Sequence, residues 1–238
     1  MSFRERLLGS LRALRPVLEV DGVMILGSEV PNLLEPQAAC TLVVSQDVDI
    51  GVPVARHDDV KRALRTIEEL RPSPDEPSVW VPSRPDLLEV NFIGVDPTLG
   101  DAGDTYVLQD DELPLLVFGQ LALVRPGRTL EVEGALLPLP RPAGLALEKL
   151  LTDRSGVKGD RDLLVVLGLL LQATTEDLDE LVGLYRALAA DLRHAVRSNL
   201  TVLSLLDTHP SMPDPAPHRE MIASLLERLE EADPDAER

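Results

Sequence analysis

The amino-acid sequence predicts an α+β protein, in which a mixed β-sheet with flanking helices is followed by a C-terminal bundle of helices. Short β-rich segments recur in the first part and commonly end at Gly or Pro. After Pro142, apolar residues instead recur every three or four positions, which is typical of helices. Because Pro138, Pro140 and Pro142 cluster where the pattern changes, we expect a domain boundary near this point. The expected domains are residues 1–140 and 141–238.

The first domain is expected to open with a helix and to alternate from there between strands and short helices. Pro31 and Pro36 should keep the helix that follows Gly27-Ser28 short. Asp58-Asp59 is typical of a helix start, and Pro72 of a helix end. In chain order we expect a helix over 2–19, a strand over 23–26, a short helix over 28–36, strands over 41–44 and 48–52, and a helix from Asp58 to Leu70.

The later part of the first domain is expected to be mainly β-structure. Gly and Asp are frequent over residues 94–113, so we expect a loop there. Pro126-Gly127 is expected to join a hairpin. The predicted strands are 79–81, 87–93, 115–124 and 129–137, and the predicted helices of the second domain are 143–152, 161–172, 175–206 and 217–231.

The charge of the chain limits its partners. A formal net charge of −18 and a pI near 4.5 argue against tight binding to nucleic acid, because that affinity comes largely from cationic side chains on phosphates. An anionic membrane surface is disfavoured for the same reason. A local basic patch remains an open alternative, formed by Arg141, Lys149, Arg154, Lys158 and Arg161.

Cysteine usage and hydropathy predict a cytoplasmic protein without a membrane segment. Cys40 is the only cysteine, so no intramolecular disulfide can form, and its simplest interpretation is a small buried apolar residue. Residues 1–20 are amphipathic and rich in Arg, unlike a signal peptide. The longest apolar run, 163–171, is about half the length that spans a bilayer.

The residues that suggest chemistry are Gly27-Ser28, directly after a predicted strand, and Asp47 and Asp49 on the next one. Because side chains alternate along a strand, both carboxylates should point to the same side. Two like charges so close repel each other unless a cation lies between them, and Mg²⁺ commonly binds one or two carboxylates together with substrate phosphates. The Gly-Ser turn can offer backbone N–H groups to those phosphates. This pattern predicts phosphoryl or nucleotidyl transfer.

A third acid or base is needed to complete such a site. On the predicted strand 87–93, Glu89 and Asn91 share one face, opposite Leu88, Val90 and Phe92. Glu89 is the first candidate for a third catalytic and metal-binding residue, and Asn91 is the second.

These residues and their order resemble the nucleotidyltransferase superfamily, whose fold is that of the DNA polymerase β catalytic domain. In that family a strand ends in Gly-Gly or Gly-Ser, a short helix follows, and the next strand carries Asp-h-Asp or Asp-h-Glu, where h is apolar. Here Gly27-Ser28 and Asp47-Val48-Asp49 match, and Glu89 stands at the third place, where the family usually has Asp. The gap from Ser28 to Asp47 is longer than in most members. The resemblance covers residues 20–172.

Within the superfamily, the chain is most similar to the stand-alone bacterial branch that includes abortive-infection toxins. Members of that branch often carry Thr-x-Asp-h-Asp, and this chain has Ser45-Gln46 before Asp47. They also carry a Lys-Leu helix, an Arg and a Lys-x-x-x-Asp-Leu segment. The matching residues here are Lys149-Leu150, Arg154, and Lys158 with Asp162-Leu163.

The resemblance implies a Mg²⁺-dependent attack of a hydroxyl on the α-phosphate of a nucleoside triphosphate. Asp47 and Asp49 would bind metal, and Glu89 would bind a second metal or act as general base. The triphosphate would contact Gly27, Ser28, Lys149 and Lys158. Lys149 and Lys158 also have a simpler interpretation, as a surface cation and as the partner of Asp162 four residues away on a helix.

Two functions therefore remain open. One is an active nucleotidyltransferase that modifies a protein, an RNA or a small molecule. The other is a nucleotidyltransferase-like scaffold without turnover that binds a partner protein, or a second copy of itself, through its C-terminal helices. The Asp47-Val48-Asp49 segment favours the first, and the acidic surface favours the second.

Overall fold

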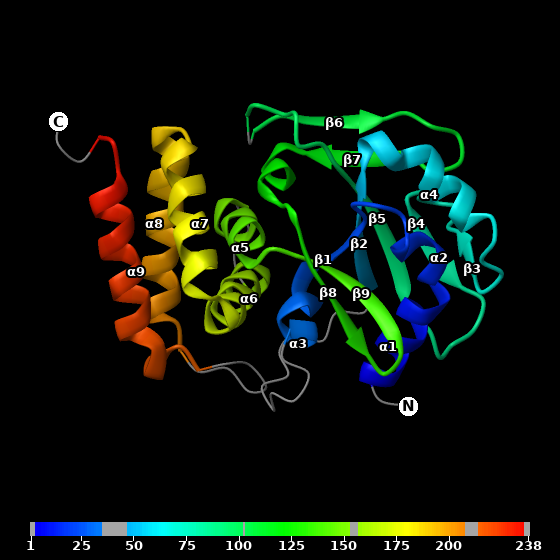
Figure 1. Ribbon diagram of the computed structural model, residues 1–238, viewed down its shortest axis with the longest axis horizontal. Helices are drawn as coiled ribbons and strands as arrows, with labels where there is room; N and C mark the ends of the chain where they lie inside the picture. Colours follow the sequence, from blue (N-terminus) through cyan, green and yellow to red (C-terminus); the bar gives the residue numbers. More distant parts are fainter. Residues whose placement is uncertain (1–2, 35–46, 102, 153–156, 208–213, 236–238) are drawn as a thin grey trace. The chain divides into compact units, whose positions relative to one another are not determined.

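The computed structural model describes residues 3–34, 47–101, 103–152, 157–207 and 214–235, with the backbone alone at 157 and 158 (Figure 1). The chain divides into two compact units. The first comprises Met1–Val30 and Val44–Arg141, and the second comprises Pro31–Val43 and Pro142–Arg238.

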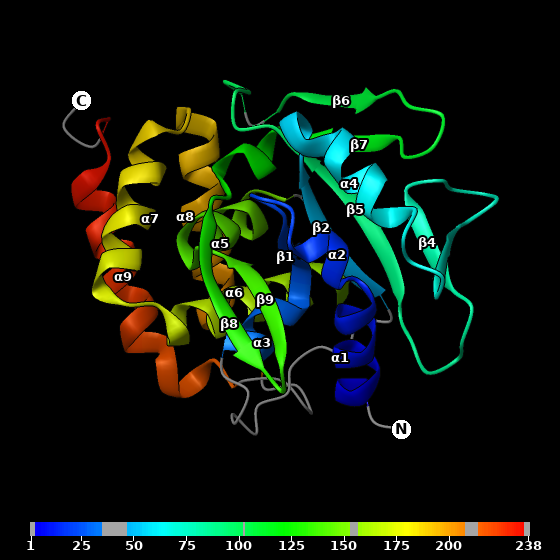
Figure 2. The same cartoon turned by 45° about the vertical axis from the view of Figure 1, so that its right-hand side comes forward.

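A mixed sheet forms the centre of the first unit, and within the described residues it has seven strands (Figures 1 and 2). Five of them follow the order β1-β2-β5-β4-β3, while β7 pairs with β5 and β6 pairs with β7. β5 pairs in parallel with β2 along its whole length. Its other edge pairs with β4 near its start and with β7 near its end. The strands are β1 (Met24–Leu26), β2 (Asp47–Pro53), β3 (Leu70–Pro72), β4 (Val79–Pro82), β5 (Glu89–Val95), β6 (Thr105–Leu108) and β7 (Leu115–Phe118).

The two central strands have one apolar side, and their other side is polar near the start of each strand and apolar further along, where Ile93 and Val95 join a second apolar cluster. Val48, Ile50 and Val90 have no exposed surface, and Phe92 is 2% exposed. Phe92 also meets Trp80 edge to face, with ring centroids 6.1 Å apart. The period of two along a strand places the intervening residues of β2 and β5 on the opposite side. Packing of the apolar residues therefore fixes which side carries the polar ones.

Helices of the first unit contribute further core. They are α1 (Phe3–Ala13), α2 (Arg15–Leu18) and α4 (His57–Leu64), and α2 lies beside α4 (Figure 2). Leu7, Leu8 and Leu11 of α1 are almost completely buried. The helix expected over 2–19 is interrupted at Leu14, where a new helix starts with Pro in its first turn, a position that tolerates Pro.

The hairpin of the first unit differs from the expected one. It consists of β8 (Pro126–Val132) and β9 (Ala135–Pro140), whereas β7 pairs with β5 and β6. The turn lies at Glu133-Gly134, where both residues have positive φ values of 49° and 78°. Two successive positive φ angles match the twist of a tight hairpin. Pro126-Gly127 therefore starts a strand and forms no turn, so that prediction was wrong.

Two further predictions in this unit were wrong. The helix starting near Asp58 ends at Leu64, and Leu70 begins β3 instead of closing the helix. The segment expected as a loop over 94–113 contains β6, which pairs with β7 along four residues. In both cases pairing with a neighbouring strand decides the backbone conformation, and such pairing is not a local property of the sequence.

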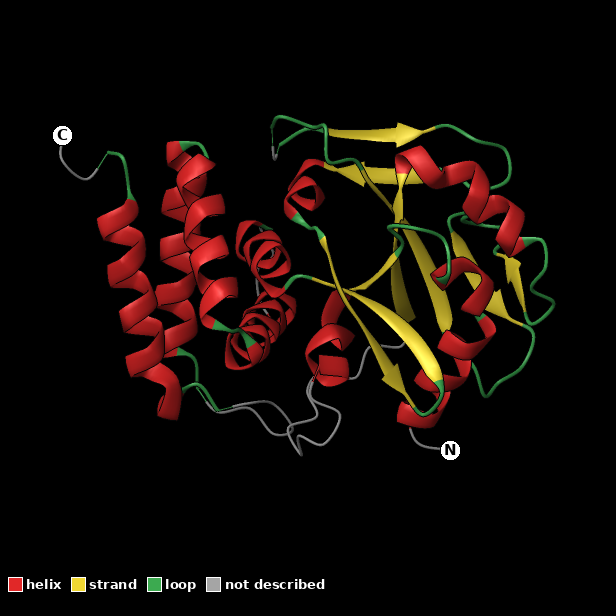
Figure 3. Ribbon diagram, viewed as in Figure 1, coloured by secondary structure: helices red, strands yellow, loops and turns green. Residues whose placement is uncertain are grey.

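Within the described residues of the second unit, the secondary-structure elements are all helices (Figure 3). Leu164, Val166, Leu167 and Leu169 are at most 2% exposed and form its apolar interior. α3 (Val30–Leu34) starts at the last residue of the first unit, and the remaining helices are α5 (Pro142–Leu151), α6 (Val157–Gln172), α7 (Thr175–Ala187), α8 (Ala190–Leu205) and α9 (Arg219–Ala232).

The helix expected over 175–206 is in fact two helices, so that prediction was wrong. Leu188 and Ala189 between them are extended, with ψ of 155° at both residues. Leu and Ala are good helix formers, so local propensity does not explain the break. Arg193 Nη1 donates to the Leu188 carbonyl at 2.5 Å, which satisfies an acceptor that the break leaves without a helical partner.

A buried ionic cluster ties the end of α9 to α7 and α8. Arg193 Nε donates to Asp233 Oδ1 at 3.0 Å, and Tyr185 Oη donates to Asp233 Oδ2 at 3.2 Å. Arg197 lies 2.8 Å from the same carboxylate, and Arg193 also pairs with Asp235. Burial raises the pKa of Tyr185 to about 12. Each buried charge thus has a partner, as a low-dielectric interior requires.

The α+β class, with a mixed sheet, flanking helices and a helical C-terminal part, is confirmed. Over the residues that the structure describes, no helix has the length and apolarity needed to cross a bilayer. The strand predicted over 41–44, and Cys40, lie outside the described residues.

Candidate functional site

Three neighbouring strands place the Gly-Ser turn, the two aspartates and Asn91 close together in the first unit, with Glu89 on the same side of the sheet. β1 and β2 are antiparallel and place Leu26 opposite Asp49, so the chain enters the Gly27-Ser28 turn beside that carboxylate. β2 and β5 are parallel and place Asp49 opposite Asn91 and Asp47 opposite Glu89. Partners in register on parallel strands point to the same side, so these four polar side chains share the side opposite the apolar core.

Asn91 makes the closest contacts to the carboxylate pair. Its amide Nδ2 donates to Asp47 Oδ2 at 2.7 Å and to Asp49 Oδ1 at 3.1 Å. Asp47, Asp49 and Asn91 are all half-buried. One amide group therefore bridges both carboxylates and lowers the repulsion between them.

Gly27 packs directly against the other side of Asp49. Its φ is +84°, and a Cβ built on it would lie 2.5 Å from Asp49 Oδ2. Any larger residue would adopt a left-handed backbone conformation at a cost and would also collide with the carboxylate. Asn91 thus holds Asp49 at Oδ1, and the lack of a side chain at Gly27 leaves the space that Oδ2 occupies.

The turn itself carries a carboxylate that sequence reasoning missed. η1 (Gly27–Glu29) is a single 3₁₀ turn, and Glu29 within it is 2% exposed. The half-buried Ser28 hydroxyl donates to Glu29 Oε1 at 3.5 Å. The sequence offered one signal for Glu29, its place between Ser28 of the Gly-Ser turn and the apolar Val30. The contact with Glu29 is one that the Ser28 hydroxyl makes within the turn that follows β1.

Glu89 is exposed at the first position of β5. Within the described part of the chain, no group of three or more His, Cys, Asp or Glu residues is placed to hold a metal ion. The three carboxylates of Asp47, Asp49 and Glu89 therefore do not converge in this structure, and the residue that reaches the aspartates is Asn91. The donor set at the site is two carboxylates and one amide.

The two lysines predicted to contact nucleotide belong to the second unit. Lys149 on α5 is 8% exposed and lies 3.1 Å from the carboxylate of its neighbour Glu148. Thr152 Oγ1 donates to the other oxygen of Glu148 at 3.1 Å. Lys158 lies in the first turn of α6, and its side chain is outside the described atoms, as is all of Arg154.

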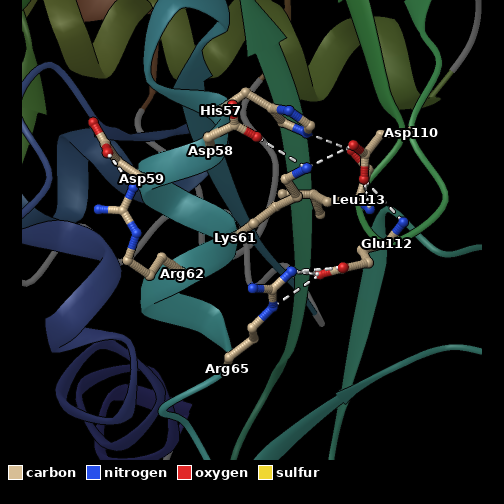
Figure 4. A network of polar contacts seen from close by, with 9 residues as sticks. All are labelled: His57, Asp58, Asp59, Lys61, Arg62, Arg65, Asp110, Glu112 and Leu113. Atoms are coloured by element: carbon tan, nitrogen blue, oxygen red, sulfur yellow. Dashed lines mark hydrogen bonds and ion pairs between the residues drawn. The ribbon is translucent and has the colours of Figure 1, made fainter.

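A polar network holds α4 to the segment before β7 (Figure 4). Lys61 Nζ lies 2.7 Å from Asp110 and 3.0 Å from Asp58. His57 Nε2 donates to the Leu113 carbonyl at 2.7 Å. Lys61 and the backbone N–H groups of Leu113 and Glu112 hold the pKa of the Asp110 carboxyl well below its usual range. Every charged group of this network has a partner, so we assign it a structural role.

Comparison with known proteins adds two similar solved structures. No protein-family model and no curated protein matches the chain. The antibiotic-resistance factor ANT(2'')-Ia is 11% identical, with a TM-score of 0.41, over 83% of this chain and 96% of the other. An antigenic nucleotidyltransferase-like protein from Paracoccidioides brasiliensis is 15% identical, with a TM-score of 0.45, over 92% and 93% of the two chains. The functional proposal therefore rests on this chain's own residues.

Proposed function

We propose that the protein is a Mg²⁺-dependent nucleotidyltransferase, which moves a nucleoside monophosphate from a nucleoside triphosphate to a hydroxyl of a protein, RNA or small-molecule acceptor. The observation that carries the proposal is the position of Asp47 and Asp49 on one side of β2, with Asp49 packed against Gly27 of the Gly-Ser turn. Carboxylates beside a turn that can approach phosphate are what such a transfer requires.

The donor set fits a hard divalent cation. Asp47 and Asp49 offer carboxylate oxygens, which Mg²⁺ prefers, and the two side chains lie on the same side of β2. We propose that these two residues hold the ion. When bound there, the cation would neutralise charge on the phosphate oxygens.

The other residues would position the reactants. Gly27 lets the backbone approach a phosphate closely, and the Ser28 hydroxyl can donate to it. The acceptor hydroxyl forms a bond to the α-phosphorus, the bond from that phosphorus to the bridging oxygen breaks, and pyrophosphate leaves. We assign the proton of the hydroxyl to Glu89, a carboxylate on the same side of the sheet. Lys149 and Lys158 remain proposed contacts of the triphosphate.

The position of Asn91 favours a second candidate function. It occupies the place opposite Asp49, where a third carboxylate would complete a two-cation site. A chain with this residue can serve as a scaffold without turnover, binding a partner protein or a second copy of itself through its C-terminal helices. In either role we expect the protein in the cytoplasm.

Two labels on the same triphosphate test the type of reaction. The protein is incubated with Mg²⁺, a cell lysate or total RNA, and a nucleoside triphosphate labelled at either the α- or the γ-phosphate. Nucleotidyl transfer places the α label on a macromolecule or a small acceptor and releases the γ label as pyrophosphate. Transfer of the γ label to an acceptor would indicate phosphoryl transfer instead. Absence of transfer from all four common triphosphates would favour the scaffold.

A further inference from the structure

The amide of Asn91 lies where a cation would be attracted. Its Nδ2 is 2.7 Å from Asp47 Oδ2 and 3.1 Å from Asp49 Oδ1, so it contacts one oxygen of each carboxylate. Ionised carboxylates only accept hydrogen bonds, so the nitrogen and not the oxygen of the amide must face them. The partly positive N–H groups thus occupy the space between the two negative charges.

This contact makes Asn91 a competitor of any cation for the same two oxygens. A cation placed where the amide lies, between Asp47 Oδ2 and Asp49 Oδ1, must displace it. The amide is neutral, so its contact with the two carboxylates adds no charge repulsion. Asp47 and Asp49 can therefore stay close together without a metal ion. The free energy gained when a cation binds is then smaller than for two carboxylates that no amide bridges.

The charge at the site also argues against two bound cations. Two cations close together need several negative ligands to offset their mutual repulsion. The register places neutral Asn91, not an acid, opposite Asp49, and Glu89 opposite Asp47 is exposed. Within the described residues no third acidic group joins the pair.

We propose that Asn91 limits the Asp47–Asp49 pair to at most one divalent cation. The inference rests on the proposed function, because that function is the reason to expect a cation at this pair. It goes further by assigning to Asn91 a role as the residue that sets cation occupancy and affinity. The acid at this position that a two-cation site would need can be supplied by a single substitution.

The test is a Mn²⁺ titration of the purified full chain without nucleotide, followed by the electron paramagnetic resonance signal of the free ion. Four proteins are compared: the unchanged chain, Asn91→Asp, Asn91→Ala and Gln109→Glu. Gln109 is exposed, so its substitution adds the same charge by the same amide-to-acid change away from the strands of the site.

We expect at most one Mn²⁺ per unchanged chain. Asn91→Asp should bind a second ion, or bind the first at least ~10-fold more tightly, because it removes the competing donor and adds a charged ligand. Gln109→Glu should match the unchanged chain. Two ions on the unchanged chain, or an Asn91→Asp titration identical to that of the unchanged chain, would overturn the inference.

Asn91→Ala keeps the inference testable if Asn91→Asp does not fold. It removes the competing donor without adding charge, so it should bind one Mn²⁺ several-fold more tightly than the unchanged chain. Weaker binding by Asn91→Ala would mean that the amide assists the ion, and would refute the competition.

The outcomes also separate this inference from the proposed function. If the unchanged chain binds no ion and Asn91→Asp binds one or two, Asn91 blocks the pair and the inference holds, while the proposed function is then decided by the transfer of α-labelled nucleotide, because substrate phosphates can complete the site. If the unchanged chain binds one ion and Asn91→Asp is no different, the inference fails and the proposed function stands. If neither protein binds an ion, the inference fails, and the transfer assay alone decides the proposed function.

Discussion

Gly27 leaves the space in which the Asp49 carboxylate lies, because a Cβ at Gly27 would be 2.5 Å from Asp49 Oδ2. β1 and β2 are antiparallel neighbours, so the turn and the carboxylate meet where β1 ends. The Gly-Ser turn and the aspartate pair, separated by a long stretch of sequence, are thereby parts of one site. This contact supports a direct test.

Gly27→Ala should destabilise the protein by two separable effects. Alanine at a positive φ costs about 1–2 kcal/mol, and the collision with Asp49 should add roughly 1–3 kcal/mol. Gly134→Ala is the matched control, because Gly134 has φ of +78° and no atom within 4 Å of its added Cβ. Urea unfolding of both variants gives the loss in free energy of unfolding for each, and the difference between the two losses measures the collision. Equal losses in the two variants would contradict the contact between Gly27 and Asp49.

Arg193→Met should destabilise the helical unit strongly. It leaves the buried Asp233 with one cation fewer, and removing one partner of a buried ion pair costs about 3–5 kcal/mol. Because Arg197 still contacts Asp233, we expect a loss at the lower end of that range, measured by urea or thermal unfolding.

Arg228→Met is the control for the ionic cluster. Arg228 pairs with Asp179 at 2.7 Å, but the two side chains are 37% and 66% exposed. An exposed pair of this kind contributes about 0–1 kcal/mol. Similar losses for Arg193→Met and Arg228→Met would show that burial of the cluster does not matter.

Asp110 should make stability depend on pH in the acidic range. Its pKa is lowered in the folded state, chiefly by the hydrogen bond from Lys61, so the folded chain binds its proton less readily than the unfolded chain does. The stabilisation is present above the unfolded pKa of about 3.9 and is lost as pH falls below it, toward the folded pKa.

The comparison for this prediction is Asp110→Asn. The variant should be less stable than the unchanged chain at pH 7, and the gap should narrow between pH 4 and pH 2. Asp75→Asn, at an exposed turn position, should run parallel to the unchanged chain throughout. If the difference in stability between the unchanged chain and Asp110→Asn stays constant with pH, the ionised form of Asp110 is not the cause of the pH dependence.

The side of the sheet that carries the site was predictable from the sequence, because alternation along a strand is local. Val48, between the two aspartates, and Ile50, directly after them, are buried, as the alternating pattern indicates. Which residue of β5 lies opposite Asp49 was not predictable. Glu89 and Asn91 share a face, and only the register between strands places Asn91 there.

Elements that depend on distant contacts were also missed. A hairpin turn with Glu133 at positive φ has no strong local signal, since Glu seldom adopts that conformation. The break at Leu188-Ala189 lies between good helix formers and is supported by Arg193 from the next helix. In both places tertiary structure overrides local preference.

The most direct measurement of the central claim is transfer of an α-labelled nucleotide by the unchanged chain, Asp49→Asn and Asp75→Asn in the presence of Mg²⁺. The substitution at residue 49 removes one negative charge from the pair but preserves side-chain size. We predict labelled acceptor with the unchanged chain and with Asp75→Asn, and at least ~100-fold less with Asp49→Asn. Equal labelling by all three proteins would contradict the assignment of Asp47 and Asp49 as the catalytic pair.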